Sequence, residues 1–223
     1  MQAPACLDEA TFAEGLRSLS DRDCDLGRIV DELGFPPMWM REPGFPTLVR
    51  IILEQQVSLA SARAAYERLL NSVEVLTPER FLRLDGATLK RIGFSRQKAA
   101  YCNHLASAIA EGTLKLDTFA MMEDNSVRRE LMKIRGIGTW TADIYLLMAL
   151  RRPDAWTSKD LALAVAVQRV KGLQERPSSE ELDCISEMWR PWRAVAARIL
   201  WHFYLTERRK KVMESQNGKA PLF

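Results

Sequence analysis

Residues 131–143 read LMKIRGIGTWTAD, which is the end of one helical pattern, the turn Gly136-Ile137-Gly138 and the start of a second helix. Two glycines around one apolar residue let the backbone approach another group closely, and the free N–H groups at the start of the following helix can bind an anion such as phosphate. We expect Ile137 to anchor the turn in the core. A plain corner between two helices is at least as common, so the context of the turn decides between the two interpretations.

Apolar residues recur at helical spacing on both sides of this turn, and sustained period-two alternation rich in Val, Ile and Thr is absent from the sequence. This pattern predicts an all-α protein. Proline and glycine divide the chain into short helices, which we expect at 9–18, 22–33, 46–54, 58–72, 77–91, 95–110, 125–133, 139–150, 160–171, 178–189 and 191–209.

The chain has 223 residues and a net charge of +3, from 32 basic and 29 acidic side chains. The charge is unevenly distributed, because residues 1–40 contain eight acidic side chains and three arginines, whereas basic residues gather in 86–100 and 191–211. Such asymmetry permits a face that binds a polyanion, although it does not prove one.

The composition also excludes some classes of protein. Four cysteines form no CxxC pair and only two histidines are present, so we expect no protein-ligated zinc or iron–sulfur centre. The apolar run 161–167 is far shorter than the ~20 residues of a membrane span, and the acidic N-terminus lacks the pattern of a signal peptide. We expect a monomer without a membrane partner, in the cytoplasm or at the nucleoid, or in the nucleus of a eukaryote.

Four blocks of sequence occur in order along the chain: 48–58 (LVRIILEQQVS), 92–99 (IGFSRQKA), the hairpin running into 156–163 (WTSKDLAL), and 189–193 (WRPWR) followed by Trp201. Together they resemble the helix-hairpin-helix (HhH-GPD) DNA glycosylase superfamily, and within it the compact form of the 3-methyladenine DNA glycosylase II (AlkA-type) branch. The resemblance implies two helical subdomains with an active-site cleft between them. One comprises residues 1–43 and 153–223, and the other comprises residues 44–152 with the hairpin at about 125–150.

The resemblance implies a monofunctional DNA glycosylase of base excision repair, which flips alkylated purines out of double-stranded DNA and hydrolyses the N-glycosidic bond to leave an abasic site. Asp160 matches the catalytic aspartate of the family, which stabilises the oxocarbenium-like sugar and activates water. Without the resemblance, Asp160 would be an ordinary helix N-cap. Bifunctional members carry a Schiff-base lysine at the position of Trp140, so no lyase activity is expected.

Four residues occupy positions of the family's base pocket, of which two match its pattern and two depart from it. Trp140 and Trp201 correspond to aromatic residues that would sandwich a flipped, electron-deficient base, although both also lie on apolar stripes typical of a core. Ile144 and His202 stand where the AlkA pattern has tyrosines, and His202 also fits a helical histidine with its own hydrogen-bond partner. These departures leave the range of substrates open.

The turn after the helix at 46–54 matches the DNA wedge of the family. Gln56 is expected to enter the minor groove and fill the gap left by the flipped base, with Gln55 beside it. Alternatively, Gln55 is a structural side chain that bonds backbone carbonyls. Glu54 replaces the usual glycine, and Lys159 replaces a frequent acidic neighbour of the catalytic aspartate.

The resemblance also implies contacts to phosphate and to a cation. Phosphate is expected at the N–H groups of Gly136, Gly138 and Thr141, assisted by Arg96 and Lys98. A structural Na⁺ or K⁺ is expected on the backbone carbonyls of Met132, Ile134 and Ile137. No cofactor is expected to be required.

Two other functions fit parts of the sequence. The chain could be a non-catalytic helix-hairpin-helix protein that binds DNA lesions, or an all-α interaction protein in which every tryptophan belongs to the core. The order of the four blocks and the position of Asp160 favour the enzyme.

Overall fold

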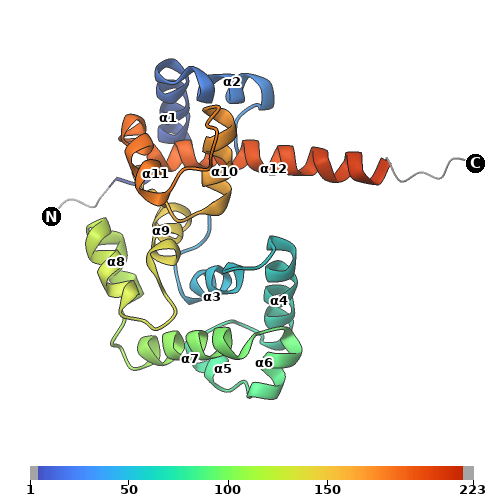
Figure 1. Ribbon diagram of the computed structural model, residues 1–223. Coiled ribbons are helices and arrows are strands. Elements are labelled where there is room, and N and C mark those ends of the chain that lie inside the picture. Colours follow the sequence, from blue (N-terminus) through green and yellow to red (C-terminus); the bar gives the residue numbers. More distant parts are fainter. Residues whose placement is uncertain (1–4, 218–223) are drawn as a thin grey trace, which may run out of the picture. The chain divides into compact units, whose positions relative to one another are not determined.

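The computed structural model describes residues 5–217 (Figure 1). Every regular element in this range is helical, with twelve α-helices, two 3-10 helices and no strand, so the all-α prediction is confirmed. Within this range the chain divides into a central unit, formed by Ala5, Cys6 and Met40–Arg152, and a terminal unit, formed by Leu7–Trp39 and the residues from Pro153 to Asn217. Between residues 5 and 217, none of the helices combines the length and the apolar character that crossing a membrane requires.

The observed units differ from the predicted subdomains near residue 40 and at the N-terminus. The Arg41 backbone N–H donates to the Met148 carbonyl at 3.0 Å, and the Arg41 guanidinium pairs with Glu54, so residues 40–43 pack with the central unit. The Cys6 thiol lies 3.6 Å from the carbonyl oxygen of Leu150, which attaches the N-terminal segment to the same unit.

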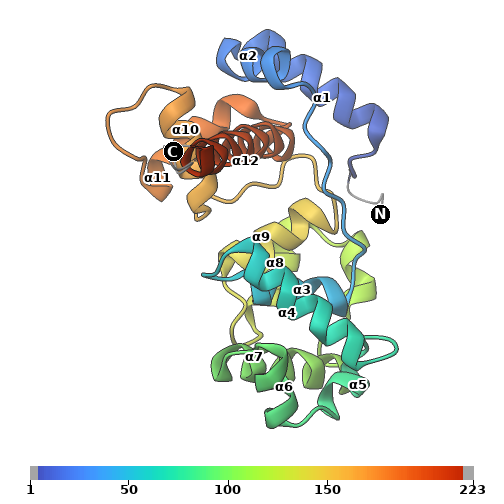
Figure 2. The same cartoon turned by 90° about the vertical axis from the view of Figure 1, so that its right-hand side faces the viewer.

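The central unit contains α3 (Phe45–Glu54), α4 (Leu59–Ser72), α5 (Pro78–Leu82), α6 (Gly86–Ile92), α7 (Arg96–Ala110), η1 (Leu116–Met121), α8 (Asp124–Met132) and α9 (Thr139–Met148). In α9 all residues from Thr141 to Met148 are buried, and most of α3 is buried as well. Helices that are apolar on every side belong in a core. Accordingly, α3 packs against α4, α7 and α9, and in the view of Figure 2 α4 lies in front of α3.

The single helix expected at 77–91 is wrong, because the structure has two helices there. The first, α5, ends at Leu82, and Asp85 starts α6 by accepting the Thr88 backbone N–H at 2.7 Å. Asp85 thus provides an N-cap that favours a new helix start over continuation of the first. The short 3-10 helix η1 was not expected from the sequence pattern.

The terminal unit contains α1 (Glu9–Arg22), α2 (Cys24–Leu33), α10 (Leu161–Val170), α11 (Ser179–Ser186), η2 (Glu187–Trp189) and α12 (Arg193–Asn217). Helix α12 is longer than the expected 191–209, and its residues from Ala194 to Leu200 are all buried. It packs against α1, α2 and α10. The terminal unit therefore builds its core around the first half of α12.

Two buried polar side chains tie the terminal unit together. Asp23 accepts hydrogen bonds from Lys171 Nζ at 2.7 and 2.8 Å and from Trp189 Nε1 at 2.8 Å, which connects the start of α2 to α10 and η2. Arg198 donates to the carbonyl oxygens of Met38 at 2.7 Å and Ala194 at 2.8 Å. Complete burial lowers the pKa of Arg198 to about 10, so this guanidinium stays charged at neutral pH.

Candidate functional site

Asp160 is the centre of the candidate site in the terminal unit. It is the N-cap of α10, and its Oδ1 accepts the Leu163 backbone N–H at 3.0 Å. The same oxygen accepts the Nε1–H of Trp201 at 3.1 Å. Asp160 is half-buried, whereas the neighbouring Lys159 is exposed. The carboxylate is therefore a helix N-cap, and it also contacts the indole of Trp201, which the family resemblance assigns to the base pocket.

Trp39 is a second aromatic residue beside Trp201, and the sequence analysis did not identify it. The two ring centroids lie 6.5 Å apart with an interplanar angle of 74°. The backbone of Trp39 has a φ of 47°, a conformation that costs free energy for a bulky residue and that is often retained at functional sites. Trp39 lies in an irregular segment between prolines, where no periodicity could indicate its role.

His202 follows Trp201 on α12, but its imidazole has a partner in the terminal unit. Its Nε2 lies 3.1 Å from the carbonyl oxygen of Leu33, at the end of α2. A carbonyl can only accept, so Nε2 carries the proton in this contact. The geometry agrees with the alternative in which His202 is a helical histidine with its own hydrogen-bond partner.

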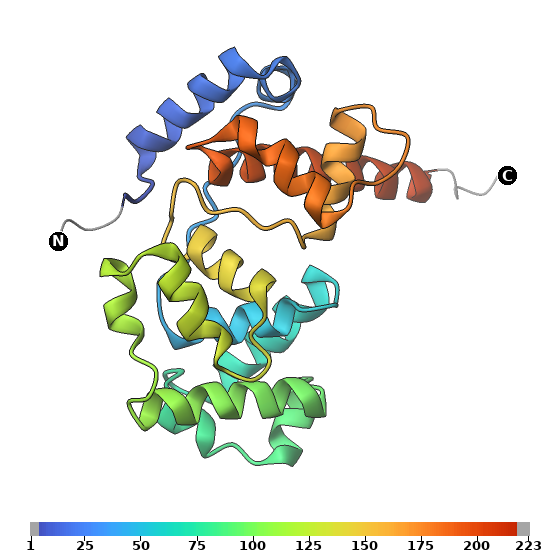
Figure 3. The same cartoon turned by 60° about the vertical axis from the view of Figure 1, so that its left-hand side comes forward.

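The hairpin lies between α8 and α9 in the central unit (Figure 3). Gly136 has a φ of 92°, and a Cβ at this position would lie 2.1 Å from the Tyr101 ring. Gly138 is the N-cap of α9, and a Cβ there would meet no atom within 4 Å. Ile137 is buried as expected. The first glycine is thus required by the fold, while the second leaves open space in front of the first turn of α9.

No side chain caps the start of α9, because its N-cap is a glycine. The positive end of the helix dipole and the N–H groups of the first turn therefore suit an anion. Trp140 is half-buried in this first turn, whereas Ile144 and Thr141 are buried. A partly buried ion pair between Arg128 and Asp143, 2.6 Å long, joins α8 to α9 on either side of the hairpin turn.

Gln55 connects the hairpin to the turn between α3 and α4, residues 55–58, which is called the wedge turn after its expected role. Its Nε2 donates to the Gly136 carbonyl at 3.0 Å and to the Thr141 hydroxyl at 2.9 Å. These bonds correspond to the structural alternative for Gln55. The next residue, Gln56, is exposed and has a φ of 54°. The turn therefore holds Gln55 inward and presents Gln56 to solvent.

Lys98, which is expected to assist phosphate binding, has hydrogen-bond partners inside the central unit. Its Nζ donates to the carbonyl oxygens of Leu53 at 2.7 Å and Gln55 at 2.8 Å, at the end of α3 and the start of the wedge turn. Partial burial lowers the pKa of this ammonium group. Lys98 therefore supports the wedge turn from within the central unit, whereas Arg96 is exposed.

The carbonyls expected to hold a monovalent cation belong to Met132 at the end of α8 and to Ile134 and Ile137 in the turn. The negative end of a helix dipole favours a cation at such a place. The Ile134 carbonyl already accepts the Ile137 N–H at 3.0 Å, which leaves one of its two lone pairs. No group of three or more His, Cys, Asp or Glu side chains that could hold a metal ion occurs in the described part of the chain.

Comparison with known proteins identifies similar chains. Residues 49–192 match the family described as HhH-GPD superfamily base excision DNA repair protein. The chain is 30% identical over 184 residues to a "Putative DNA-3-methyladenine glycosylase YfjP" of Bacillus subtilis, covering 79% of this chain and 64% of that protein. It is also 30% identical over 215 residues to "DNA-3-methyladenine glycosylase 2" of Escherichia coli, covering 87% of this chain and 73% of that protein.

A solved structure has a similar fold. It is the 3-methyladenine DNA glycosylase Mag1 of Schizosaccharomyces pombe in complex with abasic DNA. The two chains are 26% identical and superimpose with a TM-score of 0.79. The match covers 84% of this chain and 95% of the other.

Proposed function

The chain belongs to the HhH-GPD superfamily of base excision DNA repair proteins, and from this premise we propose that it is a DNA glycosylase that releases alkylated purines from duplex DNA. The single observation that carries the proposal is the carboxylate of Asp160, held at the start of α10 by the Leu163 N–H and the Trp201 indole. A carboxylate fixed in this way suits the stabilisation of a cationic sugar.

In the proposed reaction, the bond between C1′ of the deoxyribose and the purine nitrogen breaks, and the base leaves with the bonding electron pair. Asp160 stabilises the positive charge that develops on the sugar. A water molecule then adds its oxygen to C1′, and Asp160 accepts the proton that this water loses. The products are the free base and an abasic site.

The base-binding residues in this proposal are the two tryptophans. Trp201 contacts Asp160 directly, and Trp140 occupies the first turn of α9 after the hairpin. A purine that carries a positive charge stacks on an indole more strongly than a neutral base does, by about 1 kcal/mol. Such a purine is also a good leaving group, so binding and reactivity would select the same alkylated bases.

We also propose that the enzyme lacks lyase activity. The residue two positions after Gly138 is Trp140, and an indole cannot form the Schiff base that precedes strand cleavage. The DNA strand would then remain intact after base release. In the same proposal, Gln56 is the wedge, since it is exposed at the tip of the turn between α3 and α4.

The test is release of methylated purines from duplex DNA treated with dimethyl sulfate. Asp160→Asn is expected to lose about 10²-fold or more in rate, while the helix start is preserved because Asn is also a good N-cap. Asp21→Asn, which changes an exposed carboxylate on α1 of the same unit, is the control and is expected to keep the rate. Equal release by wild type and Asp160→Asn would overturn the assignment of Asp160.

The same reaction tests the absence of lyase activity. The strand is expected to break only after treatment with hot alkali, which cleaves at abasic sites. Binding to abasic DNA without release of any base would identify a lesion-binding protein instead of an enzyme.

A further inference from the structure

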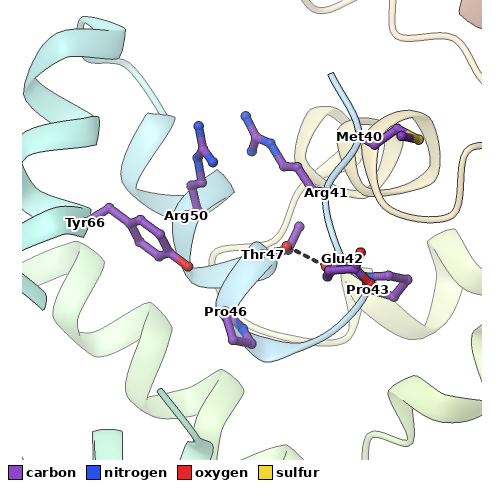
Figure 4. Close-up of a pocket in the computed structure, with 8 residues that line it drawn as sticks. All are labelled: Met40, Arg41, Glu42, Pro43, Pro46, Thr47, Arg50 and Tyr66. Carbon is purple, nitrogen blue, oxygen red and sulfur yellow. Dashed lines mark hydrogen bonds between the residues drawn. The ribbon is translucent and has the colours of Figure 1, made fainter. Parts of the chain in front are cut away.

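A pocket of about 330 Å³ opens in the central unit, at a place that no step above uses (Figure 4). Its lining comes from residues 40–47, from Arg50 on α3 and from Tyr66 on α4. The side chains of Arg41 and Arg50 lie next to each other there and extend in the same direction (Figure 4). All of these residues belong to one unit, so the pocket is a property of that unit alone.

The two arginines share one carboxylate. Arg41 donates to both oxygens of Glu54 at 2.9 Å, and these two side chains are only 14% and 10% exposed. Arg50 reaches the same carboxylate through Nε alone, at 3.3 Å, and its side chain is 43% exposed. One carboxylate compensates one guanidinium, so a positive charge is left on the Arg50 side of this cluster.

Two kinds of donor remain for a ligand. Among the hydrogen bonds of the described residues, none involves the terminal Nη atoms of Arg50 or the hydroxyl of Tyr66. The Arg50 guanidinium carbon lies 5.8 Å from the centre of the Tyr66 ring, a cation–π contact, and both side chains line the pocket. Burial raises the pKa of the Tyr66 hydroxyl, which therefore stays protonated and able to donate at neutral pH.

The other polar groups of the lining are already engaged or exposed. The Thr47 hydroxyl donates to the Glu42 carbonyl oxygen at 2.6 Å and is not available to a ligand (Figure 4). Glu42 itself is exposed, where solvent and salt screen its charge. A ligand in the pocket therefore meets a guanidinium and a phenol, which is a donor set typical of phosphate recognition.

We propose that this pocket binds a phosphodiester group of the DNA backbone through the guanidinium of Arg50 and the hydroxyl of Tyr66. This contact is separate from the one expected at the hairpin. The location supports the proposal, because Arg50 lies one helical turn, about 6 Å, before the end of α3, where the exposed Gln56 follows. A phosphodiester beside the wedge would fix the duplex against α3. The proposal rests on the function proposed above, since it names a further contact to the same DNA.

The test compares Arg50→Gln with Arg83→Gln, which removes an exposed arginine between α5 and α6 of the same unit. Binding to a duplex with a stable abasic-site analogue is measured over a series of salt concentrations. Arg50→Gln is expected to weaken binding about tenfold and to reduce the slope of log K against log salt by about one. Arg83→Gln is expected to change neither quantity. Arg41 still pairs with Glu54 in Arg50→Gln, so no buried charge loses its partner.

Two further variants separate a phosphate contact from a structural role. Tyr66→Phe is expected to weaken binding about threefold without changing the slope, because it removes a donor and no charge. Glu54→Gln is expected to tighten binding and to increase the slope by about one, because it leaves both guanidinium groups uncompensated. A merely structural role for the cluster would weaken binding in both variants.

The pocket proposal is overturned if Arg50→Gln is folded by circular dichroism and binds the duplex with the affinity and slope of the wild type. Base release that depends on Asp160 would then persist, so the proposed function would stand without this site. A rise in melting temperature with inorganic phosphate that is lost in Arg50→Gln, together with unchanged duplex binding, would assign the pocket to free phosphate and overturn the DNA contact.

Discussion

The indole Nε1–H of Trp201 donates to Oδ1 of Asp160 at 3.1 Å, and the same oxygen caps α10. Two donors from different helices thus orient one carboxylate oxygen, which fixes the rotation of the carboxylate about its side-chain bonds. Trp201 is 8% exposed and packs edge-on against Trp39, so its own position is fixed in turn. The tryptophan predicted to stack on a base is therefore also a positioning residue for the proposed catalytic group.

Trp201→Phe separates these two roles. A phenyl ring can still stack on a base, but it cannot donate to Asp160, and a hydrogen bond to a charged group contributes about 1.5–3 kcal/mol. We expect the single-turnover rate of base release to fall at least tenfold, whereas binding to abasic DNA changes less than threefold. Trp156→Phe is the control, because the buried Nε1 of Trp156 has no hydrogen-bond partner. Equal rate losses in the two variants would contradict a positioning role for Trp201.

The local features of the site can be predicted from the sequence because they depend on neighbouring residues. Gly136 lies in the turn that follows α8, Gly138 is the N-cap of α9, and Asp160 stands just before an apolar helical run. The hydrogen-bond partner of a long side chain cannot be predicted in this way, because it depends on how distant segments of the chain pack together. Lys98 reaches a carbonyl 43 residues away, and no local pattern distinguishes it from the exposed Arg96.

Trp39 and Arg41 illustrate the same limit. Both lie in an irregular segment, and both acquire their contacts from helices that follow much later in the chain or from the end of α3. Glu54 is visible in the sequence as a departure from the expected glycine. Arg50 pairs with it locally along α3, but only the fold brings Arg41, from outside that helix, to the same carboxylate.

Lys98→Met tests the support of the wedge turn. Methionine keeps the apolar stem, but two carbonyl oxygens at the end of α3 lose their donor, which costs about 1–2 kcal/mol in the free energy of unfolding. Because Lys98 faces these carbonyls, we expect the salt dependence of duplex binding to stay unchanged. Urea unfolding and binding over a salt series measure the two effects.

Arg96→Gln is the matched comparison for Lys98→Met. Arg96 is exposed at the start of α7, so its removal is expected to leave stability within about 0.5 kcal/mol of the wild type. If Arg96 contacts phosphate as expected from the sequence, the salt slope falls by about one. A reduced slope in Lys98→Met with unchanged stability would restore the phosphate role for Lys98.

The network around Asp23 makes the stability of the terminal unit depend on pH. Burial alone raises the pKa of Asp23. The hydrogen bonds from Lys171 and Trp189 and the positive charge of Lys171 outweigh burial, so the pKa of Asp23 lies below its ordinary value. Burial likewise lowers the pKa of Lys171, and its contacts with Asp23 and Asp25 raise the net value. The stabilisation is therefore present between about pH 4 and pH 10, and is lost below and above this range.

Lys171→Met is expected to reduce the free energy of unfolding at pH 7 by about 3 kcal/mol, because it leaves the carboxylate of Asp23 buried without its ion-pair partner. The difference from wild type should shrink as the pH falls below about 4, where protonation removes the charge of Asp23 in both proteins. Lys210→Met, on the exposed part of α12, is the control. A difference that does not vary with pH would contradict the electrostatic origin.

Gly136→Ala is expected to disturb the fold of the hairpin. The φ of 92° is strained for alanine, and the added Cβ would overlap the Tyr101 ring, with the nearest ring atom at 2.1 Å. Strain and overpacking together cost about 2–4 kcal/mol. The free energy of unfolding measured in urea checks this value, and a stability equal to that of the wild type would show that the turn adopts another conformation.

Gly138→Ala has the opposite expectation, because its φ of −98° suits any residue and its Cβ would meet no atom within 4 Å. Stability is expected to stay within about 0.5 kcal/mol of the wild type. If a DNA phosphate approaches the first turn of α9, the methyl group would displace it, and duplex affinity is expected to fall about tenfold. Loss of affinity without loss of stability would separate a glycine kept for the ligand from one kept for the fold. Unchanged affinity would exclude close approach of a phosphate at Gly138.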